Sequence, residues 1–407
     1  MKILIVSQYF WPESFRINDL ALELNNRGHN IVVLTGKPNY PDGKYYKGYS
    51  FCKNNRENYF GVDIRRVPII PRNTGSGFWL IMNYLSFVLF SCLYIIFHRE
   101  KFDITFTFAV SPITQVYPAL LHKFLYKSKT FLWVQDLWPE SVSAAGNIKN
   151  KIIHNLLNKL VVSIYRSSDQ ILVSSTGFIN SINTKLGSDK KQITYFPNWA
   201  EDIFLDVIND DITIPRLPEG FKIMFAGNIG EAQDFESIVQ AILLTNTLPI
   251  NWIFIGEGRK LSWFKNEIEL NNIKNVYFLG RLHIDLMPRL YNFADVMLVT
   301  LKRKSIYALT VPSKIQSYLA SGKIIIGMLD GEGNKIINES KGGYCVNSGN
   351  YRGLASLIAN LLKIGYNEKQ LMQESSKKYY NEHFLKNILL NKLEILFSEN
   401  ATNSIKI

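Results

Sequence analysis

Short runs of apolar residues alternate with longer stretches of helical periodicity through both halves of the chain. The runs are rich in Ile, Val and Phe and lack regular polar alternation, which is typical of strands buried on both faces of a parallel sheet. Stretches such as 16–27 and 235–244 predict helices between these strands. We expect strands at 3–7, 31–35, 64–67, 104–108, 131–135, 171–174 and 193–196, and again at 222–226, 252–255, 276–279, 296–300, 324–328 and 344–346.

The alternation of strands and helices runs through once and restarts near Phe221. Residues 202–220, with Pro215, Pro218 and several acidic side chains, separate the two runs. This organisation predicts an α/β fold of two doubly wound, Rossmann-like domains that face each other across a cleft, with ligands at the carboxyl ends of the strands. The expected parts are a first domain at 1–200, a linker at 201–220, a second domain at 221–385, and a C-terminal helix at 386–407 that could return to the first domain.

Composition narrows the class of protein. The chain has 407 residues, of which 47% are hydrophobic and 20% charged, so a long disordered polymer is excluded and two or three domains are expected. Cys52, Cys92 and Cys345 show neither metal-ligand nor disulfide-framework spacing, and no two histidines are spaced i,i+4. We therefore expect no metal and a reducing compartment. The first residues, 1–6, have the pattern of a strand rather than of a signal peptide.

The net charge of +12 lies almost entirely in the first half. Residues 1–200 contain 23 Lys/Arg and 12 Asp/Glu, a net of +11, whereas residues 201–407 contain 23 and 22, a net of +1. The first half is therefore expected to meet an anionic partner such as nucleic acid, a membrane surface or a phosphorylated ligand. Nucleic acid is the least favoured, because the basic residues form no tract with interleaved aromatic residues.

Residues 78–97 interrupt the pattern with twenty uncharged residues, followed by the polar segment 98–101. Their length and composition fit a transmembrane helix, but a span at this place would put strands of one sheet on opposite sides of the membrane. An interfacial membrane helix is favoured, and a buried core helix and a true span stay open as alternatives. The residues expected to mark a more polar face are Asn83, Tyr84, Ser86 and Ser91.

In the second half, glycine-bearing turns follow three successive strands, whereas the turn after the first strand of the chain, 7–13, is bulky. Glycine lets backbone N–H groups approach a phosphate closely, and arginine adds charge-assisted contacts. One such turn is more often merely tight, but several at one sheet edge favour a nucleotide or nucleotide-sugar site. The candidate donor-binding residues here are Gly227, Asn228, Gly230, Gly256, Arg259 and Arg281.

The segment 310–323 (TVPSKIQSYLASGK) predicts a short helix that leads into a strand. Pro312 and Ser313 suit a helix start, and Gly322 suits its end. The amides at the start and the Lys314 ammonium could bind an anion, and an ordinary capped helix with Lys314 in solvent is the alternative. The candidate donor-binding residues here are Pro312, Ser313, Lys314, Gln316 and Ser317.

Six blocks in the first half carry a family resemblance: QYFWPE at 8–13, RINDL at 16–20, RGH at 27–29, LTGKPNYPDG at 34–43, WVQDLWPES at 133–141 and FPNW at 196–199. Together with the helix at 310–323 they resemble the GT4 family of retaining glycosyltransferases, which have the GT-B fold. The blocks are most similar to bacterial O-antigen and capsule L-fucosamine (FucNAc) transferases. The resemblance spans essentially the whole chain, and it implies a nucleotide-sugar site in the second domain, with no metal or other cofactor.

Two departures from the family pattern affect the donor site. The two glutamates that the family carries in its second half fall on Leu309 and Ser317, and its basic pair near the first glycine turn falls on Asn228 and Gln233. The resemblance then implies that Ser317 or Gln316 holds the ribose through neutral hydrogen bonds. The groups left to meet the diphosphate charge are backbone amides, Arg259, Arg281 and Lys314.

On the acceptor side, this chain has Asp136 where the family often has a histidine near the donor sugar, and Glu140 is the second carboxylate. Asp136 could orient the acceptor hydroxyl or stabilise oxocarbenium charge, and a structural role stays equally open. Retaining enzymes of this fold are thought to let the leaving diphosphate help deprotonate the acceptor, so stabilisation of the leaving group would dominate; a hydrolase-type carboxylate pair is not evident. The remaining acceptor-side candidates are Arg16, Asn18, Asn39 and Asn198.

The expected function is retaining, metal-independent transfer of a sugar from UDP-FucNAc, or a related UDP-N-acetyl sugar, to a polyprenyl-diphosphate-linked saccharide in O-antigen or capsule biosynthesis. We expect a cytoplasmic protein bound peripherally to the inner face of the plasma membrane, which would account for the basic first half and for residues 78–97. Two alternatives stay open: a UDP-sugar 2-epimerase of the same fold, and a non-catalytic, membrane-associated nucleotide-sugar-binding subunit.

Overall fold

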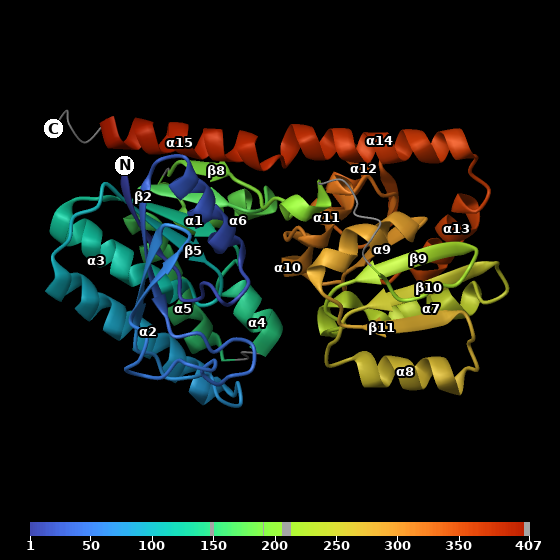
Figure 1. Cartoon of the computed structure of the whole chain (residues 1–407), viewed down its shortest axis with the longest axis horizontal. Helices are drawn as coiled ribbons and strands as arrows, with labels where there is room; N and C mark the ends of the chain where they lie inside the picture. Colours follow the sequence, from blue (N-terminus) through green and yellow to red (C-terminus); the bar gives the residue numbers. More distant parts are fainter. Residues whose placement is uncertain (147–149, 190, 206–212, 403–407) are drawn as a thin grey trace. The chain divides into compact units, whose positions relative to one another are not determined.

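The chain divides into two compact α/β units (Figure 1). The computed structural model describes residues 1–146, 150–189, 191–205 and 213–402. Unit 1 comprises Met1–Phe196 and Leu390–Ile407, and unit 2 comprises Pro197–Leu389. Of the linker expected at 201–220, residues 206–212 lie outside the described ranges, as do 403–407 of the expected C-terminal helix.

Unit 1 is built on an eight-stranded sheet in the order β3-β4-β2-β1-β5-β6-β7-β8. Neighbouring strands pair in parallel except β3, which pairs antiparallel with β4. The strands are β1 (Lys2–Val6), β2 (Asn30–Gly36), β3 (Arg56–Tyr59), β4 (Val62–Val67), β5 (Ile104–Ala109), β6 (Lys129–Val134), β7 (Gln170–Val173) and β8 (Ile193–Tyr195).

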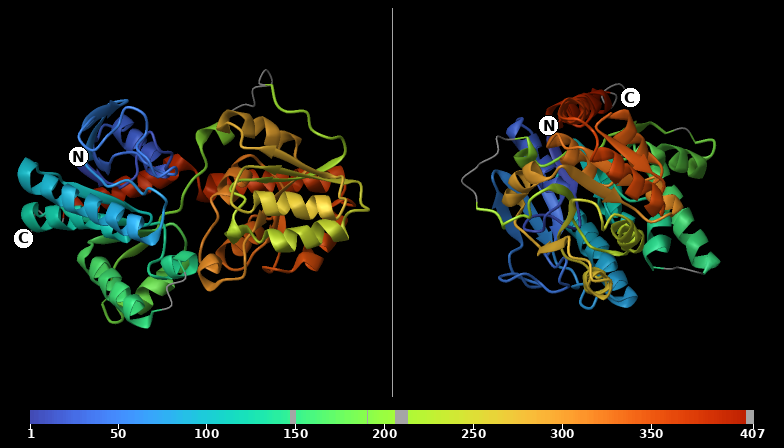
Figure 2. Two further views of the ribbon diagram at one scale, coloured as in Figure 1. Left: turned by 90° about the horizontal axis from the view of Figure 1, so that it is seen from below. Right: turned by 90° about the vertical axis from the view of Figure 1, so that its right-hand side faces the viewer.

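The helices of unit 1 connect these strands, and α2 and α3 lie alongside each other (Figure 2). They are α1 (Arg16–Asn26), α2 (Gly77–His98), α3 (Tyr117–Tyr126), α4 (Glu140–Gly146), α5 (Lys151–Ser167) and α6 (Gly177–Leu186), with a 3₁₀ turn at Ile113–Val116 before α3.

Among the described residues, the structure contains all the expected strands of unit 1 and adds β3. The sequence of β3, Arg-Glu-Asn-Tyr, has no apolar run, because this strand lies at the edge of the sheet and alternates exposed with half-buried residues. Edge strands of this kind are commonly short and charged, which blunts pairing with other chains. The apolar pattern used for buried parallel strands therefore cannot find it.

Unit 1 also includes the end of the last helix, α15 (Lys386–Thr402), from Leu390 onward. Phe397 is fully buried, and its ring packs edge-on against Phe131 and Phe106, with centroids 4.9 and 6.2 Å apart. Glu394 binds the side chains of Arg27 and His29 at 2.7 and 2.9 Å. The last residues of the chain therefore complete the core of the unit that its first residues begin.

Unit 2 is built on a six-stranded parallel sheet in the order β11-β10-β9-β12-β13-β14. Alternate residues of β9 supply two separate cores: Ile223 and Phe225 pack on one face, and Met224 and Ala226 on the other. This confirms strands that are buried on both sides. The strands are β9 (Phe221–Ala226), β10 (Ile250–Ile255), β11 (Val276–Gly280), β12 (Val296–Thr300), β13 (Ile325–Met328) and β14 (Gly343–Val346).

The helices of unit 2 cover the two faces of this sheet (Figure 1). They are α7 (Phe235–Leu244), α8 (Leu261–Leu270), α9 (Met287–Phe293), α10 (Ser305–Ala308), α11 (Lys314–Ala320), α12 (Glu332–Glu339), α13 (Tyr351–Leu361) and α14 (Tyr366–His383), with 3₁₀ turns at Asp202–Phe204, Glu231–Gln233 and Ile284–Leu286.

Helix α2, which contains the expected apolar segment, has its polar and apolar sides reversed relative to an ordinary surface helix. Asn83, Ser86 and Ser91 are buried, whereas apolar side chains face outward. Asn83 accepts a 2.6 Å hydrogen bond from Gln8 Nε2 and donates at 2.5 Å to the carbonyl of Ile70. The exposed apolar residues are Phe78, Ile81, Leu85, Leu89, Leu93, Ile96 and Phe97, from 37% to 75% exposed.

Candidate active site

Three glycine turns interlock at the carboxyl edge of the unit 2 sheet. The Gly227 amide donates to Ile255 O at 2.9 Å, and the Gly256 amide donates to Gly280 O at 2.8 Å. A side chain at Gly256 would lie 1.9 Å from Gly227 O, and one at Gly258 would lie 2.2 Å from Ile229 O. Gly256 and Gly258 are therefore needed for the turns to pack on one another, so their glycine identity has a structural reason without any ligand.

Lys314, the first residue of α11, lies beneath the first of these turns. Its Nζ is 3.7 Å from the centre of the Phe225 ring and 3.3 Å from Gln233 Oε1. A Cβ on Gly227 would come within 3.2 Å of the same Nζ. Burial lowers the pKa of Lys314 to about 7, because no carboxylate within the described residues forms an ion pair with it. The structure thus joins Gly227, Gln233 and Lys314, which are far apart in the sequence.

Gln316 and Ser317, the expected ribose contacts, lie inside α11. Gln316 is 2% exposed, and with its amide turned to donate, its nitrogen lies 3.2 Å from Pro312 O and 2.9 Å from Ser313 O. Ser317 is 9% exposed. The amide of Gln316 therefore holds the start of its own helix, and a ribose contact by either residue stays a prediction.

The ends of α11 agree with the sequence at one side only. Gly322 has a φ of +62° and its amide donates to Leu319 O, so the helix ends where expected. Ser313 makes no side-chain capping bond, and it is exposed. The Ile315 amide already donates to Pro312 O at 3.0 Å, so this amide is not available to an anion.

Arg259 and Arg281 are exposed and make no contact with Lys314 or its turn among the described residues. Asn228 is also exposed, and Gly230 is buried beside the Asn228 side chain. The structure therefore brings Gly227 and Lys314 together but leaves the two arginines apart from them.

A cluster of four charges beside the glycine turn was not found from the sequence. Lys260 Nζ contacts Glu231 and Glu236 at 3.1 and 2.7 Å, and Lys302 Nζ contacts the same two carboxylates at 3.0 and 3.2 Å. The four charges cancel, so the cluster fixes the segment after β9 rather than supplying free positive charge. Its members come from four separate places in the chain, and the only sequence signal is that each lies near the end of a strand or the start of a helix.

In unit 1, Asp136 follows β6 at the carboxyl edge of the sheet. Its Oδ2 accepts hydrogen bonds from the Ser111 amide at 3.1 Å and the Ser111 hydroxyl at 3.0 Å, and Trp138 Nε1 donates to that hydroxyl at 3.1 Å. Within the described residues, Oδ1 accepts no hydrogen bond. Burial raises the pKa of Asp136, partly offset by the two Ser111 bonds. Asp136 is thus a fixed carboxylate with one oxygen available.

Glu140, the second candidate carboxylate, is the first residue of α4 and forms an ion pair with Lys185 of α6. It also helps to raise the pKa of Tyr165 in α5, after the main effect of burial. The contacts of Glu140 are therefore with helices α5 and α6, and no hydrogen bond joins it to Asp136 among the described residues.

The acceptor-side candidates mostly hold loops together. Asn18 accepts from the Trp11 amide at 3.1 Å and donates to Glu13 O at 2.7 Å. Asn39 is fully buried; its amide donates to Glu13 Oε1 at 2.8 Å. Arg16 lies 3.7 Å from Asp19. Asn198 is partly buried and belongs to unit 2 rather than unit 1.

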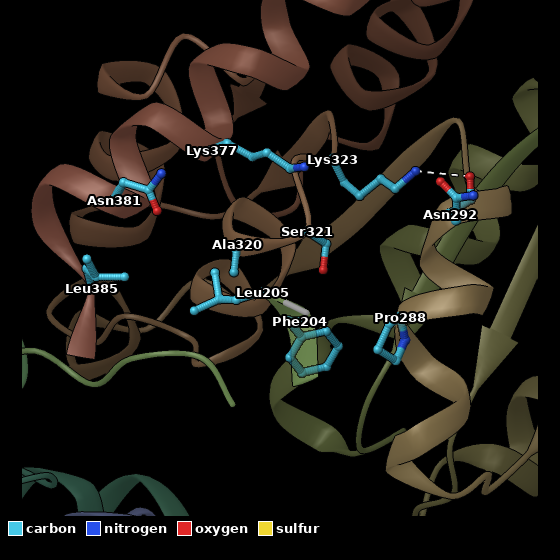
Figure 3. A pocket seen from close by; sticks show the side chains of 10 residues that line it. All are labelled: Phe204, Leu205, Pro288, Asn292, Ala320, Ser321, Lys323, Lys377, Asn381 and Leu385. Atoms are coloured by element: carbon cyan, nitrogen blue, oxygen red, sulfur yellow. Dashed lines mark hydrogen bonds between the residues drawn. The ribbon is translucent and has the colours of Figure 1, made fainter. Parts of the chain in front are cut away.

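A cavity of about 630 Å³ in unit 2 lies away from these residues (Figure 3). Lys323 lines it just before β13, at the amino end of the strands, whereas ligands of such sheets bind at the carboxyl ends. The Lys323 ammonium donates to Asn292 O at 3.0 Å, at the end of α9. This lysine therefore has a structural role, and we do not assign the cavity to the donor.

Comparison with known proteins identifies the class. Residues 15–201 match the family model described as "Glycosyltransferase Family 4", and residues 220–363 match "Glycosyl transferases group 1". The putative colanic acid biosynthesis glycosyl transferase WcaI of Escherichia coli (strain K12) is 26% identical over 79% of this chain and 82% of its own. The probable glycosyltransferase WbjE of Pseudomonas aeruginosa is 29% identical over 62% of this chain and 65% of its own.

Solved structures agree on the fold. Sucrose-phosphate synthase from Thermosynechococcus elongatus has a TM-score of 0.75 at 13% identity, covering 99% of both chains. Anabaena HepE in complex with UDP has a TM-score of 0.69 at 12% identity, over 98% of this chain and all of its own. WaaG, a glycosyltransferase involved in lipopolysaccharide biosynthesis, has a TM-score of 0.65 at 11% identity, over 97% of this chain and 99% of its own. The chain is a glycosyltransferase of the group 1/family 4 class with the GT-B fold.

Proposed function

We propose that this enzyme transfers a sugar from a UDP-sugar to a lipid-linked saccharide, with retention of configuration and without a metal. The observation that carries the donor half is Lys314. Its ammonium lies at the first glycine turn with an amide oxygen and an aromatic ring as neighbours and, among the described residues, no carboxylate. A diphosphate bound there would supply the missing counter-charge. HepE, which shares the fold, was solved with UDP.

For the transfer itself, the leaving diphosphate would carry most of the developing charge, and Lys314 would stabilise it. Asp136 would orient the acceptor hydroxyl through its available oxygen. The raised pKa of this carboxyl makes it a stronger hydrogen-bond acceptor when ionised. Glu140 is bound to Lys185 and has no part in this scheme.

Helix α2 supports a membrane-bound acceptor. It is 22 residues long with a mean hydropathy of 2.1, and only 28% of that window is buried. By length and composition it could cross a membrane, but its buried polar side chains bind β1 and β4 loops of the unit 1 sheet. We infer that α2 lies in the membrane interface, with its apolar side in lipid and the net charge of +11 on residues 1–200 towards anionic headgroups. The protein would then be cytoplasmic and peripheral.

The proposed acceptor is a polyprenyl-diphosphate-linked saccharide, and the proposed donor is UDP-FucNAc or a related UDP-N-acetyl sugar. The acceptor class follows from the apolar helix and the basic unit, and from relatives whose names refer to colanic acid and to lipopolysaccharide. The sugar rests on the sequence blocks alone. The family matches are to transferases and give no support to a 2-epimerase or a non-catalytic subunit.

The test is transfer of radiolabelled sugar from UDP-FucNAc and related UDP-N-acetyl sugars to lipid-linked acceptor extracted from membranes. We expect labelled lipid product with the anomeric configuration of the donor, an undiminished rate with EDTA, and loss of transfer in Lys314→Met but not in Lys304→Met. A rate that requires a divalent metal contradicts the metal-independent mechanism. An altered sugar formed from the donor alone would instead favour the epimerase, and no turnover of any donor would favour a binding subunit.

A further inference from the structure

Arg72 stands at the carboxyl edge of the unit 1 sheet, where the loops after β1, β2 and β4 meet. Its guanidinium carbon is 5.1 Å from the centre of the Tyr40 ring and 5.8 Å from that of Tyr9. Its backbone amide donates to Asn39 Oδ1 at 3.1 Å. Both the position of its backbone and the plane of its side chain are therefore fixed.

The rings around Arg72 form a cluster of their own. Tyr9 stacks on Phe15 with centroids 5.2 Å apart, and Tyr40 lies 5.7 Å from Tyr9 and 5.5 Å from Phe15. Tyr40 is 40% exposed, so part of this aromatic surface faces solvent. Aromatic rings hold a guanidinium by cation–π contact without cancelling its charge.

Arg72 differs from the other arginines of unit 1 in its lack of a counter-charge. Within the described residues no carboxylate forms an ion pair with Arg72. A cavity of about 540 Å³ elsewhere in unit 1 is also lined by arginines, but each of these is paired with Asp63, Glu57 or Glu100. The arginines of unit 1 with a carboxylate partner are Arg16, Arg27, Arg56, Arg65, Arg66 and Arg166.

Hydroxyl groups extend the site from Arg72 towards Asp136. Tyr84 of α2 hydrogen-bonds Arg72 and lies near enough to Asp136 for that carboxylate to help raise its pKa, after the larger effect of burial. Tyr9 is 3% exposed, and its hydroxyl makes no hydrogen bond of normal geometry within the described ranges, although it lies beside Tyr84. A buried hydroxyl in this position suits a polar ligand at the edge of the cluster.

We propose that Arg72, held between Tyr9 and Tyr40, binds a phosphate group of the membrane-anchored acceptor, namely the diphosphate that joins its lipid to its saccharide. This inference rests on the proposed function. Phe78, where the exposed apolar side of α2 begins, is only six residues beyond Arg72 (78 − 72), a distance of at most about 20 Å along the chain. A lipid-linked saccharide carries its negative charge at the same kind of junction, between lipid and sugar.

The test measures binding of farnesyl diphosphate in detergent micelles to the full chain, with UDP at saturation so that the donor site is occupied. We expect Arg72→Gln to weaken binding at least about tenfold, as for loss of a charge-assisted contact, and Arg72→Lys to weaken it less. Arg166→Gln, which removes an exposed arginine paired with Asp189, should leave binding unchanged. Farnesol should bind weakly and equally to all variants.

Separate arms distinguish other sources of the effect. Arg72→Gln should keep its melting temperature and its UDP affinity, and failure of UDP binding in the wild type would contradict the proposed donor rather than this inference. Flotation with phosphatidylglycerol vesicles should be retained in Arg72→Gln. Equal loss with these vesicles would overturn the assignment to the acceptor diphosphate in favour of a lipid headgroup. Equal farnesyl diphosphate affinity of wild type and Arg72→Gln would overturn the site itself.

Discussion

At the scale of single residues, Lys314 links position to charge state. Its ammonium is 3.7 Å from the Phe225 ring centre, and burial lowers its pKa to about 7, so about a tenth of the molecules carry this charge at pH 8. A diphosphate at the same place would favour the charged form. Binding of UDP at pH 8 is therefore expected to take up close to one proton per site. Calorimetric titration in two buffers of different ionisation enthalpy measures this uptake.

The control for this prediction is Lys314→Met beside Lys304→Met. The first should abolish the proton uptake and weaken UDP binding at least about tenfold, and the second should change neither. Because the folded pKa of Lys314 lies below its unfolded value, the folded state binds fewer protons between about pH 7 and about pH 10.5. Wild-type stability should thus gain from this group as pH rises through that window, and Lys314→Met should not. Equal uptake in both variants would contradict the site.

Glu13 gives a second prediction at this scale, with the opposite sign. It is 2% exposed, and burial raises its pKa to about 7 although its Oε1 accepts from the Asn39 and Tyr40 amides at 2.8 and 2.7 Å. Folded protein then binds more protons than unfolded protein between about pH 4.5 and about pH 7, so its stability falls as pH rises through that window. At about 1.4 kcal/mol per pKa unit, the whole effect is on the order of 3 kcal/mol.

Glu13→Gln keeps an acceptor oxygen for the two amides but cannot ionise. Its stability relative to wild type should therefore increase from pH 5 to pH 8, by on the order of 2 kcal/mol. Urea unfolding at the two pH values measures this difference. Parallel pH dependence of the two proteins would show that Glu13 is already ionised at low pH in the fold.

At the scale of elements, sequence patterns succeeded where one environment dominates a segment. Strands buried on both faces leave continuous apolar runs, and the expected runs match β1, β2 and β4 to β14. β3 was missed because an edge strand obeys a different rule. In α2 the sequence showed the polar residues but not their side: Asn83 faces inward because the carbonyl of Ile70 and the side chain of Gln8 need partners there.

The reversed orientation of α2 predicts which of its residues matter for what. Leu85 and Leu89 are 59% and 56% exposed and have no packing to lose, so Leu85→Gln with Leu89→Gln should leave the melting temperature unchanged. Burial of a leucine side chain in lipid contributes roughly 1.5–3 kcal/mol, so the double variant should bind vesicles of anionic phospholipid at least about tenfold more weakly. Flotation with such vesicles measures the bound fraction.

The matched control for α2 is Leu270→Gln, which removes a leucine that is 76% exposed at the end of α8 in unit 2. It should leave vesicle binding unchanged. Loss of stability rather than of vesicle binding in the α2 double variant would mean that this side of the helix is covered by protein.

At the scale of the whole molecule, the candidate site shows where sequence reasoning ends. Gly227 and the start of α11 could be singled out as chemistry at strand ends, because the carboxyl edge of a parallel sheet collects ligands. Their partnership could not, because Lys314 meets Gln233 across 81 residues of sequence. Arg259 and Arg281 looked equally suitable in the sequence, yet both are exposed without contacts to that turn. The direction of a side chain depends on the packing of neighbouring turns, which local patterns do not contain.

The division of charge between the halves leads to a prediction about salt. Residues 1–200 carry a net of +11 on a surface meant for anionic headgroups, whereas the proposed diphosphate contact in unit 2 is a single partly buried lysine. Raising NaCl from about 0.05 M to about 0.5 M shortens screening to well under 10 Å, which weakens exposed charges far more than buried ones. Vesicle binding is expected to fall at least about tenfold, and UDP affinity to change less than about threefold. Transfer to a lipid-linked acceptor should then fall with vesicle binding, while transfer to a water-soluble analogue of the same saccharide stays nearly constant. Equal salt sensitivity of the two transfer reactions would mean that the positive charge of the first half acts on the donor or on the transfer step rather than on the membrane.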